Sequence, residues 1–301
     1  MSEIKDLNTV NDYCAGLQLS ALHPQVSVLD LSEGIWSDQK MAEAVRYNFY
    51  AIFLKQGQPC ILKYGRQNYD YQEGTLVFLG PGQVVNIGHL DTNIQPSGHA
   101  LLFHPDFLRG TKLGDTIDQY SFFSYELNEA LHLSQREREI VLDCFGKIRQ
   151  ELSSNLDKHS KQIIHASIEL FLSYCTRFYD RQFITRDTVN LGIIAKFQSA
   201  LSHYFKSGKA QELGIPTVRY FAEVQHLSPN YFGDLVKKET GKTAQEYIQA
   251  KIIDLAKEKI FDPDKQIGEI AYELGFTYPQ HFTRFFKNRL GYSPIEYRNL
   301  S

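Results

Sequence analysis

No run of about eighteen apolar residues, the length that a membrane-spanning helix requires, occurs in this sequence. The opening segment, MSEIKDLNTV, has neither the basic residues nor the apolar stretch of a secretory signal. These two absences predict a soluble, cytoplasmic protein that has no membrane partner.

Cysteine is also scarce. The cysteines lie far apart and form no CxxC pair, so the sequence predicts neither a zinc site nor a disulfide framework. We expect all of them to be reduced and to serve in buried packing: Cys14, Cys60, Cys144 and Cys175.

A large charge of one sign is missing as well. The chain has 32 Lys and Arg against 35 Asp and Glu, and this net charge of −3 argues weakly against a nucleic-acid partner. Averages conceal local asymmetry, so the local pattern must decide. Length and apolar content are ample, because 301 residues, 43% of them hydrophobic, suffice for two ordinary domains that each bury a core.

Residues from about 20 to 110 contain short β-prone runs separated by glycine and proline, as in YNFYAIFLKQGQPCILKYG and YQEGTLVFLGPGQVVNIGH. Most of these runs are about five to eight residues long, which is an ordinary strand length. The pattern predicts an antiparallel sheet or a small barrel.

Helical periodicity begins after Ser134. This residue is a good N-cap, and Glu137 three positions later completes a capping box. A second helix is predicted over residues 161–183, with apolar residues around most of its circumference. Two explanations remain open for that helix: one side packs against another subunit, or the two helices form an intramolecular hairpin on the β-domain.

A polar stretch near residue 187, ITRDTVN, predicts a domain boundary, and every later segment favours helix. We therefore expect an α+β protein of two domains. Residues 1–185 form the β-domain with its helices at about 134–183, and residues 186–301 form an all-α domain.

The last 85 residues contain an internal repeat, and a fixed period constrains the architecture strongly. Five residues recur fifty positions later, where Phe232, Lys237, Gly241, Glu246 and Tyr247 are matched by Phe282, Lys287, Gly291, Glu296 and Tyr297. Upstream the offset is forty-nine, where Val218, Phe221 and Ala222 are matched by Ile267, Ile270 and Ala271. The change of offset places one extra residue in a turn, where length changes are tolerated.

Each copy predicts a helix-turn-helix unit, at about residues 217–241 and 267–291. In the first copy Ser228 is the N-cap of the second helix and Pro229 its first residue. Pro279 plays the same part in the second copy, so we expect the same kind of cap. Both of these helices stop at a glycine, as helix C-termini prefer.

Between the two units, residues 243–260 predict one uninterrupted helix. Its length of about 27 Å is of the same order as the roughly 34 Å between successive major-groove faces of a duplex. Two reading helices on such a spacer fit one face of double-stranded DNA.

The second helix of the second copy, YPQHFTRFFKNRLG, has an apolar side defined by Phe282, Phe285 and Phe286. A solvated surface helix has the same pattern, but the repeat and the absence of acids argue against that alternative. In such units the N-terminal residues meet base edges and later residues meet phosphates. The base-side candidates are Asn230, Tyr231 and Asp234 in the first copy and Tyr278, Gln280, His281 and Arg284 in the second, and the phosphate candidates are Lys237, Lys287 and Arg289.

The local charge limits this prediction. From Ile215 onward twelve Lys or Arg stand against eleven Asp or Glu, so non-specific attraction to DNA is modest. Specific contacts and dimerisation must supply much of the affinity, and binding should weaken as salt rises.

The run from 267 to 298, IGEIAYELGFTYPQHFTRFFKNRLGYSPIEYR, closely resembles the signature of the AraC/XylS family of bacterial transcription regulators. The resemblance covers about the last 110 residues. It implies a sequence-specific, non-enzymatic DNA-binding regulator that forms a homodimer and contacts RNA polymerase. The connecting helix departs from the pattern, since the family often has an arginine where this chain has Ile252. The matching residues are Ile270, Ala271, Gly275, Phe276, Phe282, Arg284, Phe286, Lys287, Gly291, Pro294, Tyr297 and Arg298.

The resemblance also implies an N-terminal cupin-like barrel that senses a small molecule or mediates dimerisation. The stretch GTLVFLGPGQVV from Gly74 resembles the glycine-proline turn of such barrels. The chain has no HxH pair, and Val84 and Val85 occupy the region of the later histidine of metal-dependent cupins, so we expect no metal or other cofactor. Three histidines are expected to be surface or packing residues: His89, His99 and His104.

Four strand aromatics are candidates for an effector pocket, although strand aromatics are more often core: Tyr47, Phe49, Tyr64 and Tyr69. Two alternative functions remain. One is a cupin-type metalloenzyme joined to a DNA-binding region, which predicts stoichiometric bound metal. The other is a regulator without a small-molecule ligand, whose barrel only dimerises or binds a protein.

Overall fold

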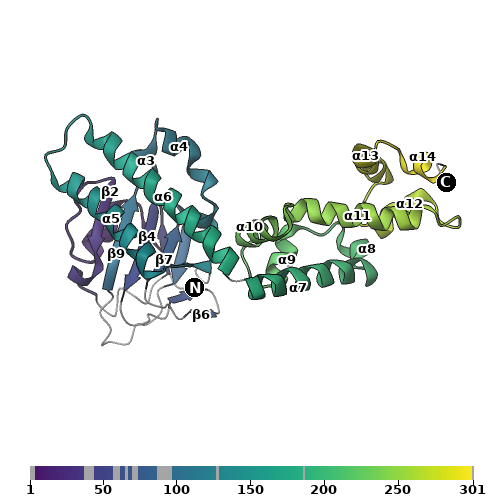
Figure 1. Cartoon of the computed structure of the whole chain (residues 1–301), viewed down its shortest axis with the longest axis horizontal. Coiled ribbons are helices and arrows are strands. Elements are labelled where there is room, and N and C mark those ends of the chain that lie inside the picture. The colour runs from purple at the N-terminus through teal and green to yellow at the C-terminus, as the bar shows by residue number, and fades with distance from the viewer. Residues whose placement is uncertain are drawn as a thin grey trace. The chain divides into compact units, whose positions relative to one another are not determined.

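The computed structural model divides the chain into two compact units, Met1–Thr185 and Arg186–Ser301 (Figure 1). None of the helices that it describes is both long and apolar enough to cross a lipid bilayer. The described residues are 4–36, 44–56, 62–64, 67–69, 74–86, 97–126, 129–185 and 187–299.

Two five-stranded sheets form the frame of the first unit. Neighbouring strands pair antiparallel, except that β1 and β3 run parallel. Each sheet keeps two edge strands, so the described strands form no closed barrel. The first sheet has the order β1 (Ile4–Leu7), β3 (Ala44–Tyr47), β8 (Gln83–Asn86), β5 (Leu62–Tyr64) and β6 (Gln67–Tyr69). The second has the order β10 (Leu131–His132), β7 (Thr75–Leu79), β4 (Tyr50–Gln56), β9 (Ser97–Phe103) and β2 (Val26–Asp30).

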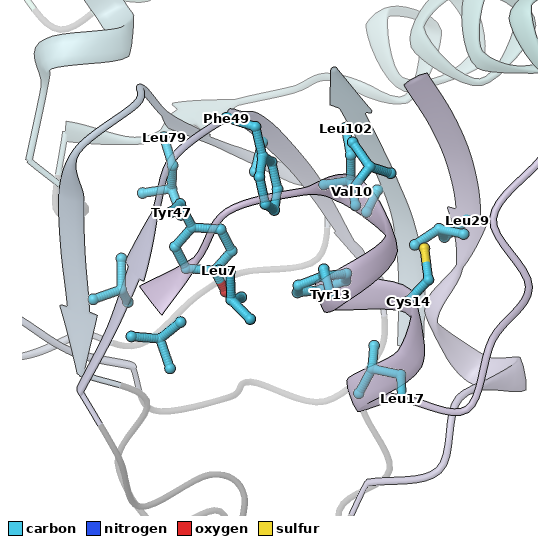
Figure 2. Close-up of a cluster of buried hydrophobic side chains, with 14 of the residues drawn as sticks. Leu7, Val10, Tyr13, Cys14, Leu17, Leu29, Tyr47, Phe49, Leu79 and Leu102 are labelled. Atoms are coloured by element: carbon cyan, nitrogen blue, oxygen red, sulfur yellow. The ribbon is translucent and has the colours of Figure 1, made fainter. Parts of the chain in front are cut away.

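The apolar core of this unit draws on both sheets and on helix α1 (Val10–Gly16), as Figure 2 shows. A capping box of Thr9 and Asp12 begins α1, and Tyr13 of this helix packs 6.1 Å from the ring of Tyr47. All five residues of β7 are buried. Because successive strand residues point to opposite faces, both faces of the second sheet must be covered there.

Helices α5 (Gln135–Ser153) and α6 (Ser160–Thr185) pack against each other and contact strands of the second sheet, α5 against β2 and α6 against β10. The predicted capping box is confirmed, because the backbone N–H of Ser134 donates to Oε2 of Glu137 at 2.8 Å. Of the two explanations for α6, the structure contains the intramolecular hairpin. It also leaves Ile163 and Leu170 of this helix 47% exposed.

Short helical segments complete the first unit: η1 (Leu31–Glu33), α3 (Pro105–Leu108), α4 (Lys112–Thr116), η2 (Ile117–Gln119) and η3 (Ser121–Ser124).

The predicted burial of the cysteines is confirmed for Cys14, Cys144 and Cys175, which are free thiols in the interior. Burial raises the pKa of Cys14 to about 11 and lifts the pKa of Cys175 well above its ordinary value. Few thiolates form under these conditions, so these cysteines are packing residues. Cys60 lies outside the described residues.

The second unit is helical throughout its described residues, so the predicted α+β composition is confirmed. Phe197 lies at the centre of its first half, with ring centroids 5.1 Å from those of both Phe221 and Phe232. The helices are α7 (Asp187–Lys206), α8 (Lys209–Leu213), α9 (Val218–Val224), α10 (Pro229–Thr240), α11 (Ala244–Ile260), α12 (Ile267–Glu273), α13 (Pro279–Leu290) and α14 (Pro294–Arg298).

Candidate nucleic-acid interface

The first helix-turn-helix unit consists of α9 and α10. Ser228 caps α10, because its hydroxyl accepts a hydrogen bond from the backbone N–H of Tyr231 at 3.2 Å. Pro229 follows in the first turn, where its missing N–H leaves no bond unmade. Gly241 ends the helix at φ 71°, a left-handed conformation that glycine adopts without strain. The predicted cap and stop of this helix are confirmed.

The second helix-turn-helix unit consists of α12 and α13. These helices have seven and twelve residues, the same lengths as α9 and α10. Gly291 ends α13 at φ 82°. Ala222 and Ala271, which the repeat matched, are both fully buried. The turn has four residues in the first unit, 225–228, and five in the second, 274–278, so the extra residue does lie in the turn.

The cap of α13 differs from the prediction. Tyr278 occupies the N-cap position, and its side chain makes no capping hydrogen bond. Capping requires a side-chain acceptor close to Cβ, and the phenol oxygen is at the far end of a ring. Tyr278 is 54% exposed, and its ring centroid lies 5.4 Å from that of the His281 imidazole in an edge-on arrangement. The expectation of the same cap in both copies is therefore wrong.

The connecting helix α11 is a single helix of 17 residues, about 25 Å long at 1.5 Å per residue. Thr243 and Glu246 form a capping box at its start, and Ser293 and Glu296 form the same box at the start of α14. The repeat matched Glu246 with Glu296 without assigning them a role. The Thr-x-x-Glu and Ser-x-x-Glu spacing is the sequence signal that identifies them. Ile252, where the resembled family often has arginine, is 1% exposed and belongs to the core.

The second helix of each unit, α10 or α13, is called its recognition helix below. Each recognition helix buries one side and exposes the other. Phe282 and Phe286 of α13 are fully buried, as predicted, and Phe285 is partly buried. The ring of Phe286 packs 5.4 Å from Tyr297 of α14, which holds α13 against the end of the unit. In α10 the buried side consists of Tyr231, Phe232, Leu235 and Val236.

Most of the predicted DNA-contacting side chains are exposed on the two recognition helices. Tyr231 is an exception, because it is 5% exposed and its ring belongs to the core. Asp234 is half-buried and has an interaction partner. The exposed candidates are Asn230, Lys237, Tyr278, Gln280, His281, Arg284, Lys287 and Arg289.

Arg289 has a partner that sequence reasoning missed. Its guanidinium donates a hydrogen bond from Nη2 to Oε1 of Gln249 on α11. Both residues line a groove of about 380 Å³ between α11 and the C-terminal ends of α10 and α13. Arg289 is thus held against the connecting helix. The sequence did not predict this hydrogen bond, because Arg289 and Gln249 are forty positions apart.

The two recognition helices differ in charge. In α10 two lysines are balanced by Asp234 and Glu239, which leaves a net charge of zero. In α13 two arginines and one lysine meet no acid, which leaves a net charge of +3 with His281 neutral. At equivalent positions, fifty residues apart, α10 has Asp234 and α13 has Arg284. The second unit therefore presents the stronger attraction for phosphate.

The aromatic candidates in the first unit divide into two groups. Tyr47 is 2% exposed and Phe49 is fully buried, both within the core cluster of Figure 2. Burial raises the pKa of Tyr47, which keeps its phenol neutral. The side chains of Tyr64 and Tyr69 lie outside the part of the chain whose side chains the structure describes.

Of the three histidines expected to be surface or packing residues, His104 and His99 lie within the described part of the chain. The ring nitrogen Nδ1 of His104 accepts the backbone N–H of Asp106 at 3.2 Å and caps α3. His99 lies in β9 with its Nδ1 buried and without a hydrogen-bond partner, and His89 is outside the described residues. Within the described ranges no three His, Cys, Asp or Glu residues group together as metal ligands.

Comparison with known proteins identifies one domain. Residues 221–300 match the family described as a helix-turn-helix domain. The chain is 34% identical over 83 residues to the uncharacterized HTH-type transcriptional regulator YobQ of Bacillus subtilis. The aligned region covers 28% of this chain and 34% of YobQ. It is 24% identical over 264 residues to the uncharacterized HTH-type transcriptional regulator YfiF of the same organism. That aligned region covers 85% of this chain and 78% of YfiF.

Among solved structures, ToxT from Vibrio cholerae shares 14% identity with a TM-score of 0.30, over 92% of this chain and 98% of that one. This similarity is too low to inform the fold. The chain spans about a third of the length of YobQ. The finding that carries weight is the domain match, which includes α10 to α14 and most of α9. The second unit therefore contains a helix-turn-helix domain.

Proposed function

We propose that this protein is a sequence-specific transcription regulator of the AraC/XylS type, which inserts α10 and α13 into successive major grooves of double-stranded DNA. The observation that carries the proposal is the duplicated unit. Two seven-residue helices precede two twelve-residue helices, and a helix of about 25 Å joins the pairs. The match to a helix-turn-helix domain and the names of the relatives support it.

The exposed residues at the start of each recognition helix supply the chemistry for reading bases. Asn230 and Gln280 stand at equivalent positions, and an amide side chain pairs with adenine through one donor and one acceptor. Arg284, one turn further along α13, has the paired donors that match guanine. Lys237 and Lys287 lie later in their helices and are assigned to phosphates.

The proposal extends to the first unit, which we assign to dimerisation and to sensing a small molecule. Its two sheets enclose an apolar cluster, and α6 presents Ile163 and Leu170 to solvent. These two residues stand seven positions apart, on one face of the helix, and exposed apolar residues that share a face are a common feature of subunit contacts. By the same family resemblance, RNA polymerase is the proposed partner on DNA.

A binding experiment tests the function. Duplexes that the full-length protein selects from a random pool are compared with random duplexes of equal length at moderate salt. The expected result is a Kd lower by at least about 10³-fold for the selected duplex. Equal Kd values for selected and random DNA, with and without candidate effectors, would overturn the proposal.

A further inference from the structure

Helix α8 contacts both helix-turn-helix units of the second half of the chain, although it precedes both of them in the sequence. It packs against α7 and against α12. Ala210, the second residue of this helix, is fully buried. The segment from Lys209 to Gly214 is called the α8 strut below.

Side chains join the strut to the first helix-turn-helix unit. The ammonium group of Lys209 donates a hydrogen bond to the hydroxyl of Tyr220 on α9 at 3.2 Å, and lies 5.9 Å from the centre of that ring. Tyr204 at the end of α7 packs on the same ring, with centroids 5.1 Å apart. The hydroxyl of Tyr204 also donates to the carbonyl of Gly214 at 3.0 Å, which fixes the end of the strut.

A backbone contact joins the strut to the second helix-turn-helix unit. A Cβ added at Gly275, in the turn between α12 and α13, would lie 2.7 Å from the carbonyl carbon of Gly214 and 2.8 Å from the nitrogen of Ile215. Only glycine permits this approach, and Gly275 also has φ 91°. Gly214 itself has φ 82°. Beside this contact, Leu213 and Tyr272 are among the residues that line a groove of about 910 Å³.

Two connections constrain the second unit more than one connection does. The helix α11 sets the distance between the units, but rotation at either end of a single helix changes the direction in which α13 points. A second attachment away from the axis of α11 opposes that rotation. The strut supplies such an attachment, from Tyr220 of the first unit to Gly275 of the second.

We propose that the α8 strut sets the angle between the two recognition helices, so that the protein accepts one spacing and one helical phase of its two DNA half-sites. This inference rests on the proposed function. Inserting one base pair between half-sites rotates one of them by about 35° about the duplex axis. A rigid pair of reading helices cannot follow that rotation without losing base contacts, whereas a hinged pair can. Lys209, Tyr204 and Gly275 are then positioning residues, since none of them needs to touch DNA.

The experiment measures the spacing penalty, defined as the ratio of Kd for a selected operator with one inserted base pair to Kd for the unaltered operator. The wild-type protein should show a penalty of about tenfold or more. Gly275→Ala should reduce it most, provided that the variant folds. The conservative double variant Tyr204→Phe/Lys209→Met removes two hydrogen bonds and leaves the glycine contact intact. It should reduce the penalty by about threefold or more.

Lys206→Met is the matched control, because it removes the same charge from an exposed position on α7. It should weaken binding to both duplexes equally and leave the penalty unchanged. A double variant that keeps its wild-type melting curve and its wild-type penalty would overturn the inference. So would a wild-type protein that binds its operator equally well at every spacing. Failure of the proposed function is a separate result, in which no duplex is preferred over random DNA at all.

Discussion

The two helix-turn-helix units have the same scaffold and different reading surfaces. Helix lengths, the buried alanines and the terminal glycines agree between them. The surfaces differ, because α10 has no net charge and α13 has a net charge of +3. The residues that hold helices together are thus the ones that the duplicated units share. Of the residues proposed to meet DNA, Lys237 and Lys287 are shared, whereas those nearer the start of each helix have diverged, as in Asp234 and Arg284.

The turns make the same point at one backbone position. His226 and Gly275 are equivalent by the offset of forty-nine and both have positive φ, 57° and 91°. His226 is exposed, so its side chain has room. Gly275 faces the backbone of Gly214 and has none. The same backbone conformation is thus held by two different residues, and glycine stands in the turn that packs against another backbone segment.

The largest expected effect comes from breaking this turn. Gly275→Ala should lower the free energy of unfolding by about 2–4 kcal/mol, because it adds a clash with the backbone to the strain of positive φ. The counterpart His226→Gly should change it by less than about 1 kcal/mol, since relief of strain offsets the greater freedom of glycine in the unfolded chain. Urea denaturation followed by circular dichroism measures both. Equal effects would contradict the difference in packing between the two turns.

The next effect separates base contacts from phosphate contacts within α13. Arg284→Ala should cost about 1–3 kcal/mol on the selected operator and much less on random DNA. Lys287→Ala should weaken binding to both duplexes about equally and reduce the slope of log K against log salt by about one. Fluorescence anisotropy titrations at several salt concentrations measure these quantities. The assignment fails if both substitutions lower both affinities alike.

A smaller effect tests the caps. Ser228→Ala should destabilise the protein by about 1 kcal/mol, because the backbone N–H of Tyr231 loses its hydrogen-bond acceptor. Tyr278→Ala removes no capping bond and should leave stability within about 0.5 kcal/mol of the wild type. Thermal unfolding of the two variants under identical conditions makes the comparison. A larger loss from Tyr278→Ala than from Ser228→Ala would show that the caps do not differ as described.

The smallest effect concerns an ion cluster around Glu273 of α12. Glu273 pairs with Lys259 and Lys265, while its equivalent in the first unit is Val224. Burial by itself raises the pKa of Glu273, and hydrogen bonds from the two lysines outweigh this and leave its pKa below the ordinary value. Glu273→Gln should therefore cost about 1 kcal/mol or less at pH 7.

The pH dependence of this loss follows from the depressed pKa. The stabilisation is present above the ordinary glutamate pKa of about 4.3 and disappears as pH falls through the lower pKa of the folded protein. The difference between wild type and Glu273→Gln should accordingly vanish in acid. Glu258→Gln, at an exposed position of α11, is the control with the same charge change. A difference that persisted unchanged in acid would exclude the ion cluster as its cause.

Local features of the second unit could be predicted from sequence. Helix periodicity, the Ser228 cap and the stops at Gly241 and Gly291 depend on residues within a few positions of one another. The cap of α13 failed because the match of Pro229 with Pro279 did not extend one residue upstream, where serine is replaced by Tyr278. Burial of Tyr231 was missed because the inward face of α10 is wider than the three-phenylalanine stripe of α13.

Features that depend on distant pairs could not be predicted. The approach of Gly214 to Gly275 joins residues sixty-one positions apart, and nothing in the five residues of α8 indicates it. The same holds for the bond between Gln249 and Arg289, and for the parallel pairing of β1 with β3. The predicted sheet region was correct in kind. Its strand order depends on contacts that no local pattern encodes.

The central claim is that both recognition helices read one face of the same duplex. Hydroxyl-radical and methylation footprinting of the full-length protein on its selected operator tests this most directly. For each bound protomer, two protected tracts should appear on one face, with their centres about one helical turn, 10–10.5 base pairs, apart. A single protected tract at saturating protein would contradict the claim, because it would mean that only one of the two units enters the major groove.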